Sequence, residues 1–249
     1  MNEPHFLRPR KSLVGIFRFS MAGFLAALVL FLVASPFTQN IENNNLVESV
    51  LFSLVLISAV LAVGHRRWVL WVALVLLAPA LIGNWVNHLR PENMLKDLYL
   101  GSSLLFVLFV ILQLMYFILC APRVNSEVLC AGIATYLLLG ILWAFAFALV
   151  ASLQPPTAHD PGAFVFSVTG PTESSHLMKG ITALYFSYIS LTTVGYGDIT
   201  PVSNVARMLS AAEAMTGTLF MAVLISRLVS MYSSQPHQEP GKKSNDTNI

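Results

Sequence analysis

The sequence predicts an all-helical membrane protein with six transmembrane helices and a shorter re-entrant helix that leads into a polar loop before the last span. Of the 249 residues, 56% are hydrophobic and 10% are charged, whereas about a quarter of the residues in an ordinary soluble domain are charged. Six apolar segments approach the roughly 20 residues that a helix needs to cross the hydrocarbon core. One glycine-containing polar stretch, SLTTVGYGDITP at 190–201, interrupts this pattern.

The expected spans are separated by breaks that contain turn-forming or charged residues. Their bounds are Leu13–Phe37, Leu46–Val63, Trp68–Val86, Leu98–Leu119, Val128–Leu149 and Val202–Met231. The first follows a basic leader, but it is longer than the apolar core of about 7–15 residues in a signal peptide, so we expect it to remain uncleaved. Pro122 ends the fourth span, and Asn125 or Ser126 can cap the fifth.

The distribution of basic residues predicts the orientation. With the N-terminus inside, ten of the fourteen Lys and Arg residues lie on the cytoplasmic side: Arg8, Arg10, Lys11, Arg18, Arg66, Arg67, Arg123, Arg227, Lys242 and Lys243. Both termini are therefore expected in the cytoplasm, and the polar tail at 233–249 is expected to be disordered. Cys120 and Cys130 flank a cytoplasmic linker, where thiols stay reduced, and are interpreted as packing residues.

The proline-rich segment from about Ser152 to His176 is then extracellular. Within it, Phe164, Val165, Phe166 and Val168 predict either a short strand or a contact with the lipid interface. Residues from about Ser175 to Leu191 predict a helix too short to cross the membrane, which Ser174 or Ser175 can cap.

Residues Thr193 to Gly197 follow this short helix as non-helical backbone at membrane depth. Such backbone is tolerated only where protein buries it or water lines it. If successive carbonyls are to face one axis, the backbone must alternate between ordinary and positive φ, which Gly195 and Gly197 permit. Four copies would stack rings of oxygens from Thr193, Val194, Gly195 and Tyr196. Such rings can replace the water shell of a monovalent cation.

The motif TTVGYGD at 192–198 resembles the selectivity filter of tetrameric potassium channels, and the resemblance extends from Val128 to Tyr232. It implies a pore domain at 127–232, preceded by a four-helix module at 1–121. The implied K⁺ ligands are the oxygens of Thr193, Val194, Gly195 and Tyr196, with Gly197 completing the filter and Thr192 supporting it. No enzymatic motif is present, and we expect no cofactor besides the transported K⁺ and no nucleic-acid partner.

The resemblance also assigns roles in the last span. Gly217 lies nineteen residues after Asp198, where the family often has a flexible glycine, and is a candidate gating hinge. Close packing of a small residue is the alternative. At helical spacing, four residues are expected to line the cavity below the filter: Thr218, Met221, Ala222 and Ile225.

Two positions depart from the family pattern. Many members have a pore-helix tryptophan that bonds the filter aspartate, and the matching position here is Phe186, which has no donor. Some members have a glutamate that pairs with the aspartate, and the matching position in this sequence is Ile189. Asp198 therefore needs another partner, such as Tyr185, Tyr188 or water.

Glu213 is a carboxyl group within a span, where a charge is costly. It is interpreted as bracing the pore helix through Ser187, Ser190 or a threonine. A direct role in gating or in attracting ions is the alternative.

The first four helices do not resemble a voltage sensor, because the span Leu98–Leu119 contains no Arg or Lys. The expected function is passive potassium conduction by a homotetramer that is not strongly voltage-gated, in contact with lipid, in a cell inner (plasma) membrane. Two alternatives remain: a membrane sensor or assembly subunit with a poorly conducting pore, and a subunit of a K⁺ uptake system. Uptake systems of related design usually have four diverged pore loops in one chain.

Overall fold

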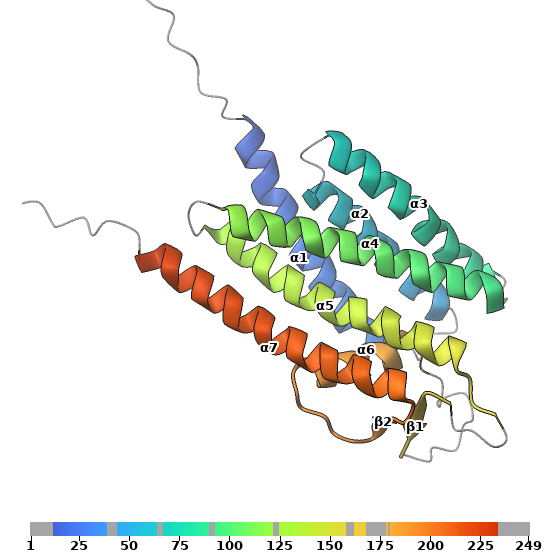
Figure 1. Ribbon diagram of the computed structural model, residues 1–249. Helices are drawn as coiled ribbons and strands as arrows, with labels where there is room; N and C mark the ends of the chain where they lie inside the picture. Colours follow the sequence, from blue (N-terminus) through green and yellow to red (C-terminus); the bar gives the residue numbers. More distant parts are fainter. Residues whose placement is uncertain are drawn as a thin grey trace, which may run out of the picture.

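The computed structural model describes residues 12–38, 44–63, 67–89, 93–121, 125–157, 162–167, 178 and 180–233. These residues form helices and one two-stranded sheet (Figure 1). The elements are α1 (Ser12–Thr38), α2 (Asn44–Val63), α3 (Arg67–Leu89), α4 (Asn93–Cys120), α5 (Ser126–Leu153), β1 (Phe164–Phe166), α6 (Gly180–Leu191), β2 (Ile199–Pro201) and α7 (Asn204–Ser233).

Each of the six predicted spans is a helix in the structure. Five of them, α2, α3, α4, α5 and α7, are long and apolar enough to cross a membrane, as expected for a multi-pass membrane protein. In α1 the apolar part is the shorter segment Met21–Phe37, so its crossing of the membrane stays a prediction. Asn125 caps α5 as predicted, because its side chain accepts a hydrogen bond of 3.0 Å from the Val128 N–H. The tail at 234–249 lies outside the described residues.

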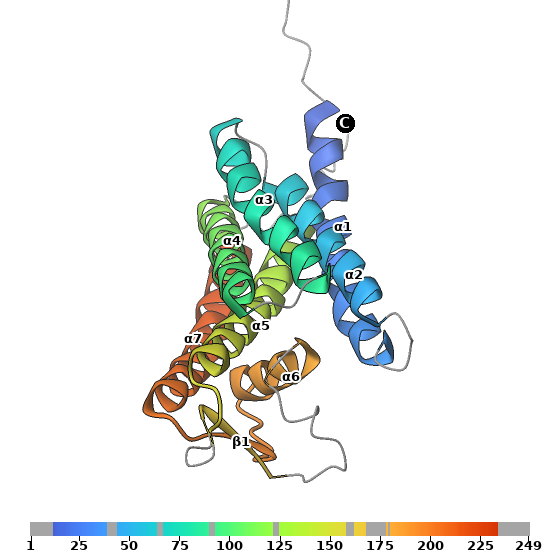
Figure 2. The same cartoon turned by 90° about the vertical axis from the view of Figure 1, so that its right-hand side faces the viewer.

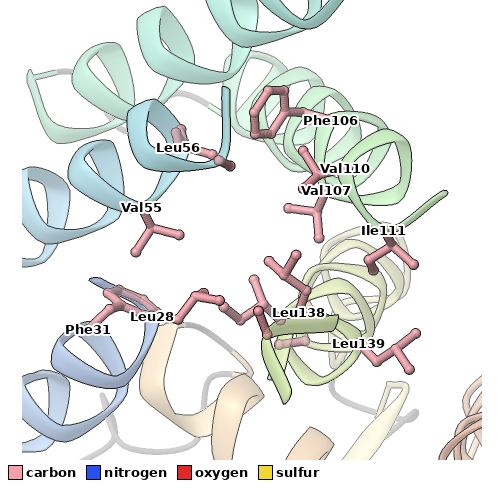
Figure 3. Close-up of a cluster of buried hydrophobic side chains, with 14 of the residues drawn as sticks. Leu28, Phe31, Val55, Leu56, Phe106, Val107, Val110, Ile111, Leu138 and Leu139 are labelled. Carbon is pink, nitrogen blue, oxygen red and sulfur yellow. The ribbon is translucent and has the colours of Figure 1, made fainter. Parts of the chain in front are cut away.

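Helix α5 connects the first four helices to the rest of the chain. Figures 1 and 2 show α4 beside α5 and α3 beside α4, while α1 packs against another side of α5 and α2 packs against α1 and α3. Their shared core contains Leu28 and Phe31 of α1, Val55 and Leu56 of α2, Phe106, Val107, Val110 and Ile111 of α4, and Leu138 and Leu139 of α5 (Figure 3). Because lipid is as apolar as these side chains, close packing is what holds such helices together.

The helix ends are grouped as the distribution of Lys and Arg predicts. The start of α1, the end of α4, the start of α5 and the end of α7 lie at one end of the bundle, and the β strands lie at the other (Figure 1). At the first end, an Nη of Arg227 in α7 donates to the carbonyls of Leu119 (2.9 Å) and Ala121 (3.2 Å). Carbonyls at a helix C-terminus lack intrahelical donors and favour a positive charge. Which end faces the cytoplasm stays a prediction.

The two strands form a small antiparallel ribbon that the sequence predicted only in part. Phe164 pairs with Pro201 and Phe166 with Ile199. The strand at Phe164–Phe166 was one of two predicted alternatives, and Val168 lies outside the described residues. The partner strand, β2, was not predicted, and it begins directly after Asp198. The ribbon therefore attaches the C-terminal end of the polar loop to the segment that follows α5.

Candidate functional site

The short helix α6 carries the polar loop at its C-terminal end. It packs against α5 and α7 and is much shorter than the other helices (Figure 2). The predicted start at Ser175 is wrong, because Met178 is not helical and α6 begins at Gly180. Gly180 has φ of +48°, a left-handed conformation that does not continue the helix toward Met178. The predicted caps, Ser174 and Ser175, lie outside the described residues.

The first amides of the polar loop point back into the end of α6. The Val194 and Gly195 N–H groups both donate to the Ile189 carbonyl, over 2.9 and 3.1 Å. Thr192 N–H donates to the Tyr188 carbonyl and Thr193 N–H to the Ser190 carbonyl, both over 3.0 Å. Ile189 therefore supports the loop through its main-chain oxygen. With their amides bonded to α6, residues 192–195 present no free N–H to an ion.

The loop backbone alternates in the way that the sequence predicted for Gly195 and Gly197. These glycines have φ of +54° and +82°, and between them Tyr196 is not left-handed. The same is true of Val194, whereas Thr193 has φ of +60° and extends the alternation by one residue. A Cβ added at Gly195 or Gly197 would meet no atom within 4 Å, so the dihedral angle, and not space, requires glycine there.

Several predicted site residues are exposed in a single chain. The exposed fractions are 53% for Val194 and 73% for Tyr196. On α7, the four predicted cavity residues are also exposed: Thr218, Met221, Ala222 and Ile225. The face of α7 that packs against the rest of the chain carries Ala206, Glu213, Gly217 and Phe220. The predicted cavity residues are therefore free to face other copies of the chain or a central axis.

Two glycines allow α6 to approach its neighbours closely. A Cβ at Gly217 would lie 2.5 Å from the Leu191 carbonyl oxygen and 2.9 Å from Leu191 Cδ1. The structure thus shows the close packing that the sequence left as an alternative, while the hinge stays a prediction. A Cβ at Gly140 in α5 would overlap the Tyr188 ring. This second contact was not predicted, because nothing in the sequence pairs Gly140 with a residue so far along the chain.

Asp198, at the C-terminal end of the loop, has one of its predicted partners. The Tyr185 hydroxyl donates to Asp198 Oδ2 over 2.8 Å, and the Ile199 N–H donates to Oδ1 over 3.1 Å. The other candidate, Tyr188, instead donates to the Leu137 carbonyl over 2.7 Å. Tyr185 therefore supplies the donor that the sequence analysis found missing.

Phe186 was matched to the family position that bonds the aspartate, but in the structure Tyr185 makes this bond and Phe186 does not. Its ring packs against Phe147 and Phe164, with centroids 4.9 and 5.3 Å apart, and its exposed fraction is 3%. Adjacent residues on an α-helix point about 100° apart, since there are 3.6 residues per turn. Tyr185 and Phe186 therefore cannot both face Asp198.

Removing the Tyr185 hydroxyl is expected to loosen the C-terminal end of the loop. In Tyr185→Phe, Asp198 loses a hydrogen bond worth about 0.5–1.5 kcal/mol. We expect retained potassium preference with a faster decline of current during sustained opening, measured in planar bilayers. Tyr116→Phe, at an exposed position on α4, is the matched control. Equal rates of decline in both variants would contradict the support role of Tyr185.

Glu213 is fully buried on α7, and one of its predicted partners lies beside it. Ser187 Oγ of α6 is 2.5 Å from Glu213 Oε1. The same Ser187 Oγ is 2.6 Å from the Gly140 carbonyl oxygen of α5. Helices α5, α6 and α7 therefore meet at a polar contact in an otherwise apolar interior.

Comparison with known proteins identifies this part of the chain. Residues 127–234 match the family Ion_trans_2, described as "Ion channel". The matched residues comprise α5, the ribbon, α6, the polar loop and α7. The relatives described below are potassium channels, so this region of the chain is similar to potassium channels.

Three of these relatives come from plants and an archaeon. Two-pore potassium channel 1 of Arabidopsis thaliana is 37% identical over 67 residues, which cover 26% of this chain and 18% of that protein. Two pore potassium channel c of Oryza sativa is 37% identical over 92 residues, covering 36% and 19%. A voltage-gated potassium channel of Aeropyrum pernix is 30% identical over 80 residues, covering 32% and 27%. The match spans less than a third of each relative, and the relatives include two types of channel.

Proposed function

We propose that four copies of this chain assemble around a central axis and conduct potassium passively and selectively across a cell inner (plasma) membrane. The observation that carries the proposal is the alternation of positive φ at Thr193, Gly195 and Gly197, together with loop amides that bond back to α6. This backbone is the one that a stack of carbonyl rings needs. One chain supplies only a quarter of each ring, so the function requires a closed ring of subunits.

Exposure of the loop and of α7 supports assembly. Val194 and Tyr196 are more than half exposed in one chain, and only 11% of the apolar part of α7 is buried. In the proposed tetramer, neighbouring copies cover part of this surface. Thr218, Met221, Ala222 and Ile225 then line a cavity below the filter. The remaining apolar surface of the bundle contacts lipid.

We further propose that the pore is not strongly voltage-gated and that both termini are cytoplasmic. Helix α4 has no Arg or Lys from Leu98 to Cys120. Moving one elementary charge through the membrane field supplies only about 2.3 kcal/mol per 100 mV, so steep gating needs several charges in each chain. The first four helices contact the pore region at both ends, through Arg227 at one end and through a 2.6 Å hydrogen bond from Ser152 to Asp97 at the other.

The proposal is tested by recording from the purified protein in lipid bilayers under opposing potassium and sodium gradients. We expect a reversal potential close to the potassium equilibrium potential and an open probability that changes little with voltage. A reversal potential midway between the two ion potentials would contradict selectivity. An absence of current from a folded tetramer would favour a poorly conducting subunit. A steep voltage dependence would contradict the role assigned to the first four helices.

A further inference from the structure

At the polar contact between α5, α6 and α7, three oxygen atoms lie close together. The two short distances between them require two hydrogen-bonding hydrogens. Ser187 Oγ lies 2.5 Å from Glu213 Oε1 and 2.6 Å from the Gly140 carbonyl oxygen. Both distances lie in the range for O–H···O hydrogen bonds, so each needs a hydrogen between its two oxygens. The side chains of Ser187 and Glu213 are fully buried within one chain.

The supply of hydrogens depends on the protonation state of Glu213. A serine hydroxyl has one hydrogen to donate, a carbonyl only accepts, and an ionised carboxylate only accepts. If Glu213 is ionised, a single hydrogen must serve two acceptors, and one close oxygen pair has none. If Glu213 is protonated, it donates to Ser187 Oγ, and Ser187 donates to the Gly140 carbonyl. Only this second arrangement satisfies both contacts.

Among the described residues, no cation is found that would balance a charge on Glu213. Of the described residues, the titratable groups on which a charge at Glu213 would act are the phenols of Tyr136 in α5 and Tyr188 in α6. The Tyr188 hydroxyl already donates to the Leu137 carbonyl. Glu213 Oε2 has no hydrogen-bond partner in the described part of the chain. A buried carboxylate without a cation beside it is far more costly than a buried neutral acid.

We propose that Glu213 is a neutral carboxylic acid that positions α6. It does so through a relay of two hydrogen bonds, in which Glu213 donates to Ser187 and Ser187 donates to the Gly140 carbonyl. The inference rests on the proposed potassium-channel function. Ser187 is two residues before Ile189, whose carbonyl accepts the Val194 and Gly195 amides. The relay therefore fixes the turn of α6 that holds the filter backbone, and it connects that turn to both α5 and α7.

Two substitutions at Glu213 separate a neutral donor from a charge. Glu213→Gln keeps the size of the side chain and a donor for Ser187 but is never charged, whereas Glu213→Leu removes the donor at similar volume. In full-length protein in bilayers, we expect Glu213→Gln to retain the ratio of potassium to sodium permeability within about twofold. We expect Glu213→Leu and Ser187→Ala to lower it about tenfold. Loss of selectivity in Glu213→Gln equal to that in Glu213→Leu, or full selectivity in Ser187→Ala, would overturn the relay.

The proton itself can be observed without conduction. The infrared difference spectrum between wild type and Glu213→Gln at neutral pH is expected to contain the carbonyl stretch of a protonated carboxylic acid. A carboxylate band in its place would overturn the proposal. Because this measurement uses only wild type and Glu213→Gln, it still tests the protonation of Glu213 if Glu213→Leu fails to fold. A wild-type protein with the acid band but no potassium preference would refute the proposed function and leave the protonation of Glu213 standing.

Discussion

Alanine at Gly195 or Gly197 is expected to abolish the preference for potassium over sodium while the tetramer still assembles. At φ of +54° and +82°, an L-residue in the left-handed region costs roughly 1–2 kcal/mol, or roughly 4–8 kcal/mol over four copies of a ring. Rotation of the peptide out of this region relieves the strain but turns a carbonyl away from the axis. Since about 1.4 kcal/mol corresponds to a tenfold change, the permeability ratio should fall at least about tenfold.

The measurement is the reversal potential under opposing potassium and sodium gradients, combined with the oligomeric state of the same sample. Gly101→Ala is the matched control, because a Cβ there meets no atom within 4 Å and Gly101 has no positive φ. The control should behave as wild type. An unchanged ion preference in Gly195→Ala would show that this loop is not the selectivity filter.

Gly217→Ala is expected to destabilise the contact between α7 and the C-terminal end of α6. The added Cβ would lie 2.5 Å from the Leu191 carbonyl oxygen, and a change of side-chain rotamer cannot move a backbone atom. Overpacking of this kind typically costs about 1–3 kcal/mol. Because Leu191 is the last residue of α6 and lies two residues before Thr193, we expect reduced conductance as well as reduced thermal stability.

A graded series of glycine substitutions distinguishes this packing role from a hinge. Gly101→Ala adds a methyl group in open space, and Gly132→Ala places one 3.0 Å from the flexible end of Leu224. The melting temperature of the purified protein should fall least for Gly101→Ala and most for Gly217→Ala. If Gly217 acts only as a hinge, Gly217→Ala should melt like Gly101→Ala and change the open probability alone.

The helical framework and the alternating backbone of the loop were predictable because both depend on local signals. Continuous apolar segments predict the spans, and the glycines at 195 and 197 predict the alternating backbone. The positive φ of Thr193 was not predictable from composition, since threonine disfavours that region and is held there by its amide bond to the Ser190 carbonyl. A hydrogen bond to the end of α6, three residues back along the chain, accompanies this departure from the preference of threonine.

The errors in the prediction concern which face a side chain occupies and which distant segments meet. Tyr185 and Phe186 are adjacent aromatic residues, and a shift of one residue exchanges the one that bonds Asp198 with the one that packs on Phe147. The pairing of β1 with β2 joins segments more than thirty residues apart, so no local pattern indicates it. The approach of Gly140 to Tyr188 is a tertiary contact of the same kind.

The contact between Arg227 and the end of α4 has a consequence for how freely the chain can vary. Arg227 donates to main-chain oxygens of Leu119 and Ala121, and every amino acid at those two positions supplies the same oxygen. Substitutions at 119 and 121 that preserve the helix end therefore leave the acceptors in place, whereas a substitution at 227 removes both bonds together. An arginine at position 227 is therefore enough to keep α7 attached to the end of α4. The sequence of the first four helices can vary widely without loss of this contact.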